Sequence, residues 1–171
     1  METILNQIYE AFKNEKYKQM KKISKHALNR YILTQNTSFF HLAVLSYVLY
    51  KILNKNRFSK KEYSEQMKNI LKELSELNNE FTIEKLNEIK RKILELESKD
   101  SRYIFDFFTK ANVKMAAILY AKGISLDTCS KISNIPKAEI LSYAGKTMMF
   151  DRLKEENTYK ERMKIARRLI E

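Results

Sequence analysis

Few residues of this sequence have the types and spacing that catalysis or metal binding requires. His26 and His41 are far apart in the sequence, and neither lies in a His-x3-His or Cys-x2-Cys pattern, so their spacing predicts no metal site. We interpret His41 as a core histidine and His26 as a surface group. Cys129 is the only cysteine and has no histidine near it in the sequence. We therefore interpret it as a small buried residue and not as a nucleophile.

The stretch Gly145-Lys146-Thr147 has the residues that end a phosphate-binding loop. Such a loop also needs a glycine five residues before Gly145 and a strand in front of it. That position is occupied by Ile140 and the surrounding pattern is helical, so no nucleotide site is predicted. The sequence thus offers no site for a catalytic group, a metal or a cofactor, and we expect a protein that is not an enzyme.

The basic residues are the second group of side chains that could serve a function. There are 33 basic and 21 acidic residues, which give a net charge of +12. Residues 1–58 hold 10 basic and 3 acidic residues, residues 59–98 hold 8 and 9, and residues 99–171 hold 15 and 9. The positive charge therefore lies at both ends and spares the middle. It predicts binding to a polyanion such as nucleic acid, although a lysine-rich surface that only maintains solubility has the same composition.

Two groups of basic residues recur at helical spacing, which places each group on one face of a helix. The first group, on a helix predicted over residues 16–33, comprises Lys18, Lys21, Lys22 and Lys25. The second group, on a helix predicted over about residues 155–170, comprises Lys160, Lys164, Arg167 and Arg168. Each group is a candidate phosphate-binding surface, and each also fits the solvated side of an ordinary amphipathic helix. An interfacial membrane helix is disfavoured because the final helix lacks aromatic anchors on its apolar side.

The elements that must position these residues are all predicted to be α-helices. The chain has two glycines and one proline, whereas a sheet would need such residues at frequent tight turns. Apolar spacing predicts helices over about residues 3–13, 16–33, 37–55, 59–78, 82–97 and 101–122, followed by two short helices and the final one. Residues 39–53 are apolar nearly all round, which predicts the central helix of a bundle. They fall short of the ~20 apolar residues that span a membrane.

Polar residues predict where several of these helices start. They are Thr37 or Ser38, the capping box from Ser59 to Glu62, and Thr82. The helices on either side of Asn78-Asn79 are expected to form a long antiparallel hairpin with nearly balanced outer charges. A break at residues 98–101 predicts a helical bundle over residues 1–98 and a second helical unit over residues 99–171.

Residues 125–145 have the spacing of a helix-turn-helix. Ser130 is the small residue where the two helices cross, and Asn134 fits the turn position that needs a positive φ. Pro136 fits the first turn of the second helix, where a missing N–H costs nothing. The remaining expectations are that the second helix closes at Gly145 and that the inward positions are Ile135, Ile140 and Tyr143.

At these residues the chain resembles the antitoxin-like helix-turn-helix of bacterial and archaeal proteins. Through Tyr143-Ala144-Gly145-Lys146-Thr147 it resembles more closely a group of uncharacterised helical archaeal proteins that end in a Tyr-x-Gly-Lys-Thr stretch. The resemblance covers about residues 111–170, departs from the pattern at Ser133, where a bulky aliphatic is usual, and implies no particular activity.

If the unit docks on DNA, residues 136–144 are the recognition helix and their outward side chains meet base edges. The outward positions are Lys137, Ala138, Glu139 and Ser142. Of these, Lys137 suits guanine and Glu139 accepts only from cytosine, which is a sparse reading face. Lys131 and Lys146 are candidates for phosphate contacts, which position a protein without specifying a sequence. A helix-turn-helix that serves only for packing is the alternative.

Three functions follow from these observations. The first is a DNA-binding regulator or antitoxin-type protein, expected to be a homodimer by analogy with other helix-turn-helix proteins. The second is an RNA- or ribonucleoprotein-associated factor that uses the basic helices as a phosphate surface. The third is a helical scaffold that binds a protein partner. The single cysteine makes a reducing cytoplasm the expected setting, and we expect no membrane association.

Overall fold

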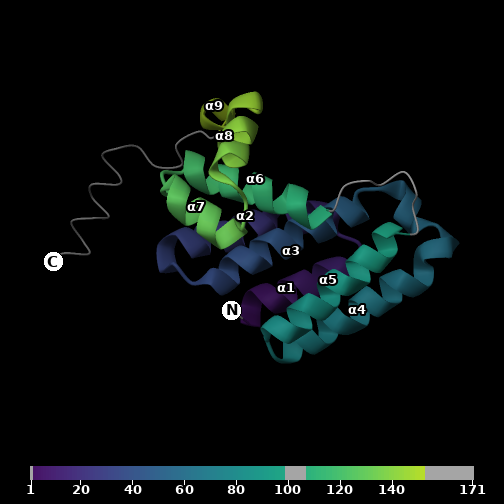
Figure 1. Cartoon of the computed structure of the whole chain (residues 1–171). Helices are drawn as coiled ribbons and strands as arrows, with labels where there is room; N and C mark the ends of the chain where they lie inside the picture. Colours follow the sequence, from purple (N-terminus) through teal and green to yellow (C-terminus); the bar gives the residue numbers. More distant parts are fainter. Residues whose placement is uncertain (1, 99–106, 153–171) are drawn as a thin grey trace.

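A computed structural model describes residues 2–98 and 107–152 of the chain (Figure 1). Over these residues the chain is helical and contains no strand, which confirms the predicted all-α class. The helices are α1 (Glu2–Lys13), α2 (Tyr17–Thr34), α3 (Thr37–Leu53), α4 (Ser64–Asn79), α5 (Ile83–Ser98), α6 (Phe107–Ala121), α7 (Leu126–Ser133), α8 (Lys137–Lys146) and α9 (Met149–Arg152). None of these helices combines the length and the apolar character that a membrane span needs.

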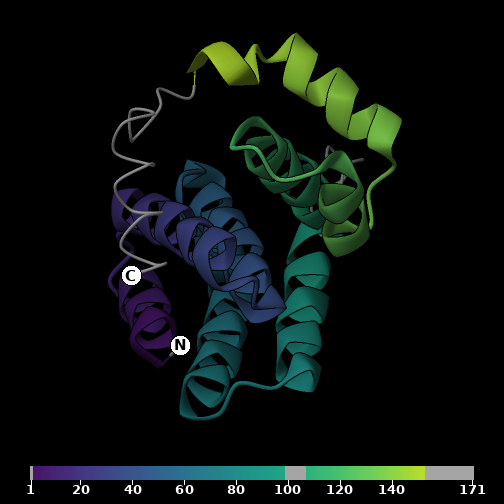
Figure 2. The same cartoon turned by 90° about the vertical axis from the view of Figure 1, so that its left-hand side faces the viewer.

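Helix α3 is the centre of the bundle, as its all-round apolar sequence predicts. Phe40, Leu45 and Ile52 have no solvent exposure, and α3 packs against both α2 and α6. Helix α1 connects this pair to the α4–α5 hairpin. Figure 2 shows the hairpin on one side of α2 and α3 and helix α8 on the opposite side. The lysines of α2 are therefore carried on a rigid, fully packed layer.

The predicted start of the central helix is wrong by one residue. Asn36 caps α3, because its side-chain oxygen accepts a hydrogen bond from the Ser38 amide at 3.0 Å. Thr37 and Ser38 lie inside the first turn of the helix. Asn ranks with Ser among the preferred capping residues, so the local sequence allows either choice and the turn after α2 decides between them.

The predicted capping box from Ser59 to Glu62 is also wrong. The segment forms two 3₁₀ turns, Asn56–Ser59 and Lys61–Tyr63, and α4 begins only at Ser64. Phe58 and Tyr63 are buried and pack edge to face with ring centroids 5.3 Å apart. This aromatic pair fixes the tighter turns, because burying two large rings outweighs one local capping interaction.

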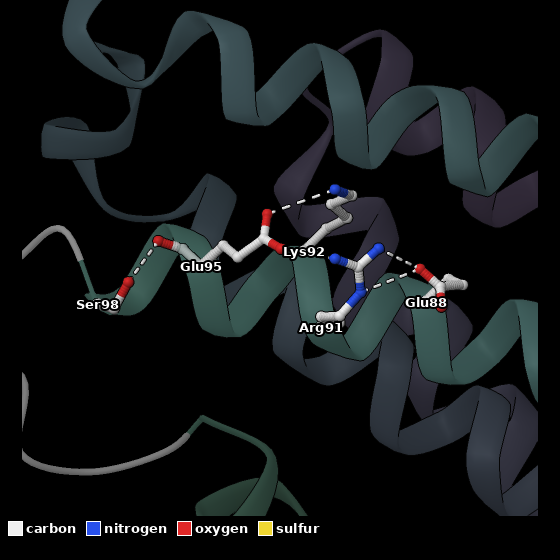
Figure 3. A network of polar contacts seen from close by, with 5 residues as sticks. All are labelled: Glu88, Arg91, Lys92, Glu95 and Ser98. Atoms are coloured by element: carbon white, nitrogen blue, oxygen red, sulfur yellow. Dashed lines mark hydrogen bonds and ion pairs between the residues drawn. The ribbon is translucent and has the colours of Figure 1, made fainter.

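The α4–α5 hairpin forms as predicted. Helix α4 ends at Asn79, and Thr82 caps α5 by accepting a hydrogen bond from the Lys85 amide at 3.2 Å. Leu94 is 47% exposed, because it lies beside the buried stripe of α5. The exposed side of α5 carries a chain of ion pairs centred on Arg91 (Figure 3).

Two predictions lie partly or wholly outside the described residues. The predicted domain boundary near residue 98 meets residues 99–106, and the final helix over residues 155–170 carries the basic group Lys160, Lys164, Arg167 and Arg168. Both stay predictions. On either side of residues 99–106, α3 packs on α6, and the buried side chains of the two described parts form one continuous core.

Candidate nucleic-acid interface

The turn between α7 and α8 has the backbone that the sequence predicts. Asn134 is left-handed with φ +54°, and the Ser130 hydroxyl donates a hydrogen bond to the Ile135 carbonyl oxygen at 2.7 Å. Ile135 and Ile140 are buried. Ser125 caps α7 by accepting a hydrogen bond from the Thr128 amide at 3.1 Å. The two short helices are thus joined by a tight turn and packed against α6.

Two expectations about the second helix need correction. Pro136 precedes α8, with ψ 140°, and is not inside its first turn. Gly145 does not close the helix, because α8 continues through Lys146 and the left-handed residue is Met148, with φ +47°. The Thr147 hydroxyl donates to the Tyr143 carbonyl oxygen at 2.7 Å, which extends the helical geometry past the glycine.

The interior of this unit accommodates a serine where a helix-turn-helix usually has a bulky aliphatic residue. Cys129 has no solvent exposure, and burial raises the pKa of its thiol to about 11, which confirms a core role. Ser133 stands where an aliphatic residue is usual, and it is also buried. Its hydroxyl donates a hydrogen bond to the Cys129 carbonyl oxygen at 2.6 Å. A buried hydroxyl is tolerated when it is bonded in this way.

The outward side of the unit holds a carboxylate that the sequence analysis missed. Asp127 binds the ammonium groups of both Lys131 and Lys137, each at 2.8 Å. These two cations lower the pKa of Asp127 to about 2 and, through the same contact, the pKa of Lys131 is raised. The i, i+4 spacing to Lys131 is visible in the sequence, but the contact with Lys137 exists only once the turn brings α8 onto α7.

The rest of the exposed side of α8 is chemically mixed. Ser142 and Lys146 are exposed, as expected, but Glu139 and Leu141 are exposed beside them. The two cations nearest the turn, Lys131 and Lys137, already share a carboxylate. The face predicted to read bases therefore carries little net positive charge.

A stronger basic surface lies over α2, α3 and α6, three neighbouring helices that contain no aspartate or glutamate (Figure 1). A groove of about 100 Å³ is lined by four lysines of α2 and α6, and a groove of about 530 Å³ by four lysines around α3 and α6. The two grooves meet at Tyr47 and Lys114, which line both. We name this surface the lysine–tyrosine face; its members are Lys21, Lys25, Lys51, Lys55, Lys110, Lys114 and Lys122 with Tyr17, Tyr47 and Tyr50.

The three tyrosines form a row across the lysine–tyrosine face. The ring centroids of Tyr17 and Tyr50 are 6.5 Å apart, and those of Tyr50 and Tyr47 are 5.7 Å apart. Lysine ammonium groups lie over these rings, which carry negative charge on their faces. The distances to the centroids are 5.7 Å for Lys21 over Tyr50, 5.5 Å for Lys51 over Tyr47 and 4.6 Å for Lys114 over Tyr47.

Tyr47 anchors the centre of this arrangement. Its hydroxyl accepts a hydrogen bond from the Lys114 ammonium at 2.9 Å. Its ring is only 8% exposed, and burial is the main reason that the pKa of Tyr47 is raised. The phenol therefore stays neutral near pH 7 and acts as a fixed acceptor that positions a cation at the junction of the two grooves.

The predicted basic group of α2 divides between two surfaces. Lys21 and Lys25 belong to the lysine–tyrosine face, whereas Lys18 and Lys22 line a shallow groove beside Glu15 and Tyr17. All four are exposed, and among the described residues none of them forms an ion pair. The lysines contributed by α3 and α6 were missed, because α3 has a single lysine and α6 only two in largely apolar helices, and only the packing gathers them.

One of the two histidines has the environment that the sequence predicts. His26 is exposed on α2, whereas His41 is only partly buried, lines a pocket outside the core and packs against the Phe40 ring with centroids 6.1 Å apart. Burial lowers the pKa of His41, and the positive charge of Lys90 lowers it further. Within residues 2–98 and 107–152, no group of three or more His, Cys, Asp or Glu side chains is arranged to hold a metal ion.

The chemistry of these surfaces has to be interpreted without relatives. Comparisons with models of protein families, with curated proteins and with solved structures found no match for this chain. The resemblance of residues 111–170 to antitoxin-like proteins therefore stays a prediction, and the function is argued from the charges and side chains of the described residues.

Proposed function

We propose that this protein is a non-catalytic nucleic-acid-binding protein and that the lysine–tyrosine face contacts the phosphates. The observation that carries this proposal is the gathering of seven lysines along two joined grooves. Five of them stand on α2, α3 and α6, which supply no carboxylate of their own, and Lys55 and Lys122 follow α3 and α6. Among the described residues Glu139 is the one carboxylate that lines either groove. A groove lined mainly by one sign of charge concentrates the field and attracts ligands of the opposite sign.

The shape and side chains of the face favour nucleic acid over other polyanions. Surfaces that bind anionic membranes present exposed apolar anchors beside their lysines, whereas Tyr47 here forms the floor of a groove. Grooves that combine lysines with aromatic rings suit a ligand with a repeating phosphate backbone and planar bases. Glu139 of α8 lines the larger groove together with four lysines, and Glu15 lines the separate shallow groove at the start of α2.

A salt titration tests the proposal. Fluorescence anisotropy with labelled duplex DNA, single-stranded DNA and single-stranded RNA would be recorded from 50 to 400 mM salt. Contact with four or more phosphates predicts a plot of log K against log salt with a slope of about −3 or steeper, since each contact contributes roughly −0.9 on duplex DNA and −0.7 on single strands. If no nucleic acid binds at low salt, the proposal fails and the protein-binding scaffold is the better explanation.

Duplex DNA binding by α7 and α8 as a helix-turn-helix is a second candidate. The left-handed Asn134 and the hydrogen bond from Ser130 to the Ile135 carbonyl support such a turn. The Asp127 carboxylate argues against base reading by α8, because Lys137 is already paired with it. Lys137→Ala would change the preferred DNA sequence if α8 reads bases, and weaker binding with an unchanged preference would assign α8 to phosphate contact only.

The exposed apolar side chains beyond α8 bear on the predicted homodimer. Leu141, Met148 and Phe150 are 44%, 64% and 53% exposed. Large exposed apolar side chains on neighbouring elements are typical of protein–protein contacts. Light scattering of the full chain at several concentrations, with and without nucleic acid, measures whether the protein is a monomer or a dimer.

A further inference from the structure

We infer that the lysine–tyrosine face binds a single strand of nucleic acid, with bases stacked on Tyr17 and Tyr50 and phosphates held by the flanking lysines. This inference rests on the proposed function and names the class of its ligand. It follows from three observations: the row of tyrosine rings, their graded exposure, and the two lysine grooves that meet at the row.

The rings become more accessible along the row. Tyr47 is 8% exposed and forms the floor where the grooves meet, Tyr50 is partly exposed, and Tyr17 is 37% exposed at the start of α2. The rings are tilted to one another, with interplanar angles of 31° and 44°. The two more exposed rings, Tyr17 and Tyr50, are the ones that a base can reach once the lysines over Tyr50 move.

A duplex cannot use these rings. In double-stranded DNA the faces of the bases are covered by their neighbours, and only their edges are reached through the grooves. Unpaired bases expose their faces and stack on aromatic side chains, which is the usual way that single strands are bound. A face made for duplex phosphates alone would need lysines but no row of rings.

The lysines that cover the rings can leave them when a strand arrives. The ammonium groups of Lys21 and Lys51 each lie 5.7 Å from the centroid of Tyr50. A phosphate offers the same ammonium a charge-assisted hydrogen bond, which is stronger than an exposed contact with a ring. Phosphate binding therefore uncovers the ring face that a base can occupy, and the two contacts support each other.

The two lysine grooves meet at Tyr47, the buried end of the row, and Lys21 and Lys51, one from each groove, lie over the next ring, Tyr50. Lys25, Lys114 and Lys122 line the groove between α2 and α6. Lys51, Lys55 and Lys110 line the groove that leads toward α8. Since the grooves join at Tyr47 and Lys114, one strand can pass from the first groove to the second with phosphates near lysines throughout.

The test compares strands and rings in the full chain. The probes are fluorescein-labelled oligo(dT) and oligo(rU) of 12 nucleotides and a mixed-sequence DNA duplex of 20 base pairs. Tyr17→Leu/Tyr50→Leu should lower single-strand affinity about 25-fold or more, since each base stacked on an aromatic ring contributes roughly fivefold or more to binding. Duplex affinity and the salt slope should stay unchanged, because the lysines remain.

Two further variants separate stacking from folding. Tyr17→Phe/Tyr50→Phe keeps both rings and should keep single-strand affinity. Tyr9→Leu removes a tyrosine of α1 that lies outside the face, with the Lys13 ammonium 5.7 Å from its ring centroid. This variant should change neither single-strand nor duplex affinity. The single variant Tyr17→Leu changes the most exposed ring and keeps the test valid if the double variant does not fold. The chain has no tryptophan, so quenching of tyrosine fluorescence on binding gives a second readout of stacking.

Three results would overturn the inference. Equal losses for single strands and duplex would mean that the tyrosines only shape the face. Unchanged single-strand affinity in the double leucine variant would exclude stacking, and tighter binding to phosphatidylserine vesicles than to any oligonucleotide would assign the face to a membrane. In the first two cases nucleic-acid binding survives. Absence of binding to every nucleic acid by the unaltered protein is the separate failure of the proposed function.

Discussion

The α4–α5 hairpin and the lysine–tyrosine face both cover the same apolar core, but they differ in how their charges are neutralised. On α5, Arg91 pairs with Glu88 at 2.6 Å and with Glu95 at 3.0 Å, and Lys92 also reaches Glu95 at 3.4 Å (Figure 3). Helices α2, α3 and α6 themselves contain no carboxylate. Lys21, Lys51 and Lys114 of these helices lie over tyrosine rings.

This difference separates charge that maintains a surface from charge that can act on a ligand. Alternating signs on the hairpin cancel within a few ångströms, so little field extends into solvent. Like charges along a groove add, and their mutual repulsion destabilises the folded chain unless an anion is bound. The net charge of +12 is therefore a property of particular helices, and the hairpin contributes almost none of it.

The largest expected effect tests whether the hairpin is structural only. Ile93 is fully buried on α5, and Ile93→Ala should lower the free energy of unfolding by about 2–5 kcal/mol, through lost burial and a residual cavity. Urea denaturation measures the loss. The variant should bind nucleic acid with unaltered affinity at a temperature where it remains folded. A parallel loss of affinity would mean that the hairpin also shapes the ligand surface.

Neutralising two lysines of the face should have the next largest effect. Lys21→Gln/Lys51→Gln removes two phosphate contacts, which predicts about 25-fold weaker binding to single strands and about 60-fold weaker binding to duplex DNA in 0.1 M salt. The salt slope should fall by roughly 1.4 and 1.8, respectively. The free energy of unfolding should change by less than about 1 kcal/mol, because relief of repulsion offsets the lost contacts with the rings.

A matched pair on the hairpin serves as the control for charge. Lys72→Gln/Lys85→Gln also removes two positive charges, one from α4 and one from α5. Lys85 pairs with Glu80 at 3.0 Å. Its affinity should stay within about threefold of the unaltered protein, since only the diffuse long-range attraction is reduced. Equal losses from both double variants would show that net charge alone drives binding, and the comparison between the two regions would collapse.

Most of the fold follows from local patterns in the sequence. Three features predict their elements correctly: the apolar periodicity of α1 and α2, the all-round apolar sequence of α3, and the cap at Thr82. Each of them depends only on residues within one or two helical turns. The start of α4 is not predictable in this way. It depends on Phe58 meeting Tyr63 in the core, a tertiary contact that overrides the capping residues around Ser59.

The candidate site is less predictable than the fold for the same reason. The lysines of α2 recur at helical spacing and are visible as a group, whereas α3 carries Lys51 alone and α6 carries only Lys110 and Lys114 in largely apolar sequences. Only the packing of α3 on α6 brings Lys51 and Lys114 together at the ring of Tyr47. The absence of carboxylates from three helices is readable in the sequence, but its meaning depends on knowing that they are neighbours.

The α7–α8 unit offers an intermediate case that sharpens the comparison. Its cations resemble those of the hairpin, because Lys131 and Lys137 both pair with the Asp127 carboxylate and the three groups together keep a charge of only +1. Asp127→Asn releases both lysines. If α8 binds DNA, duplex affinity should rise severalfold; if only the lysine–tyrosine face binds, it should change by less than about twofold, as expected for one distant surface charge. Anisotropy with the duplex used above measures the difference.

The pH dependence of the same carboxylate follows from its pKa of about 2, which is below the ordinary value of 3.8. A lowered pKa means that the ionised form stabilises the folded state. That stabilisation is complete above about pH 4 and is lost as the pH falls through 2. The carbon-13 chemical shift of the Asp127 carboxyl measures the titration directly, and a midpoint near 4 would contradict the shared ion pair.

The smallest effect on stability is expected from removing the ion pairs of Arg91 on α5. Arg91 is 57% exposed, and its contacts with Glu88 and Glu95 raise its pKa. Exposed pairs are screened by water and salt, and ordering long side chains costs entropy. Arg91→Ala should therefore leave the urea midpoint unchanged within error at both 20 and 500 mM salt. A loss comparable to that of Ile93→Ala would mean that paired charges, and not apolar packing, hold the hairpin together. The pairing would then be a source of stability, and the absence of carboxylates from α2, α3 and α6 would be a cost that the fold bears for its ligand.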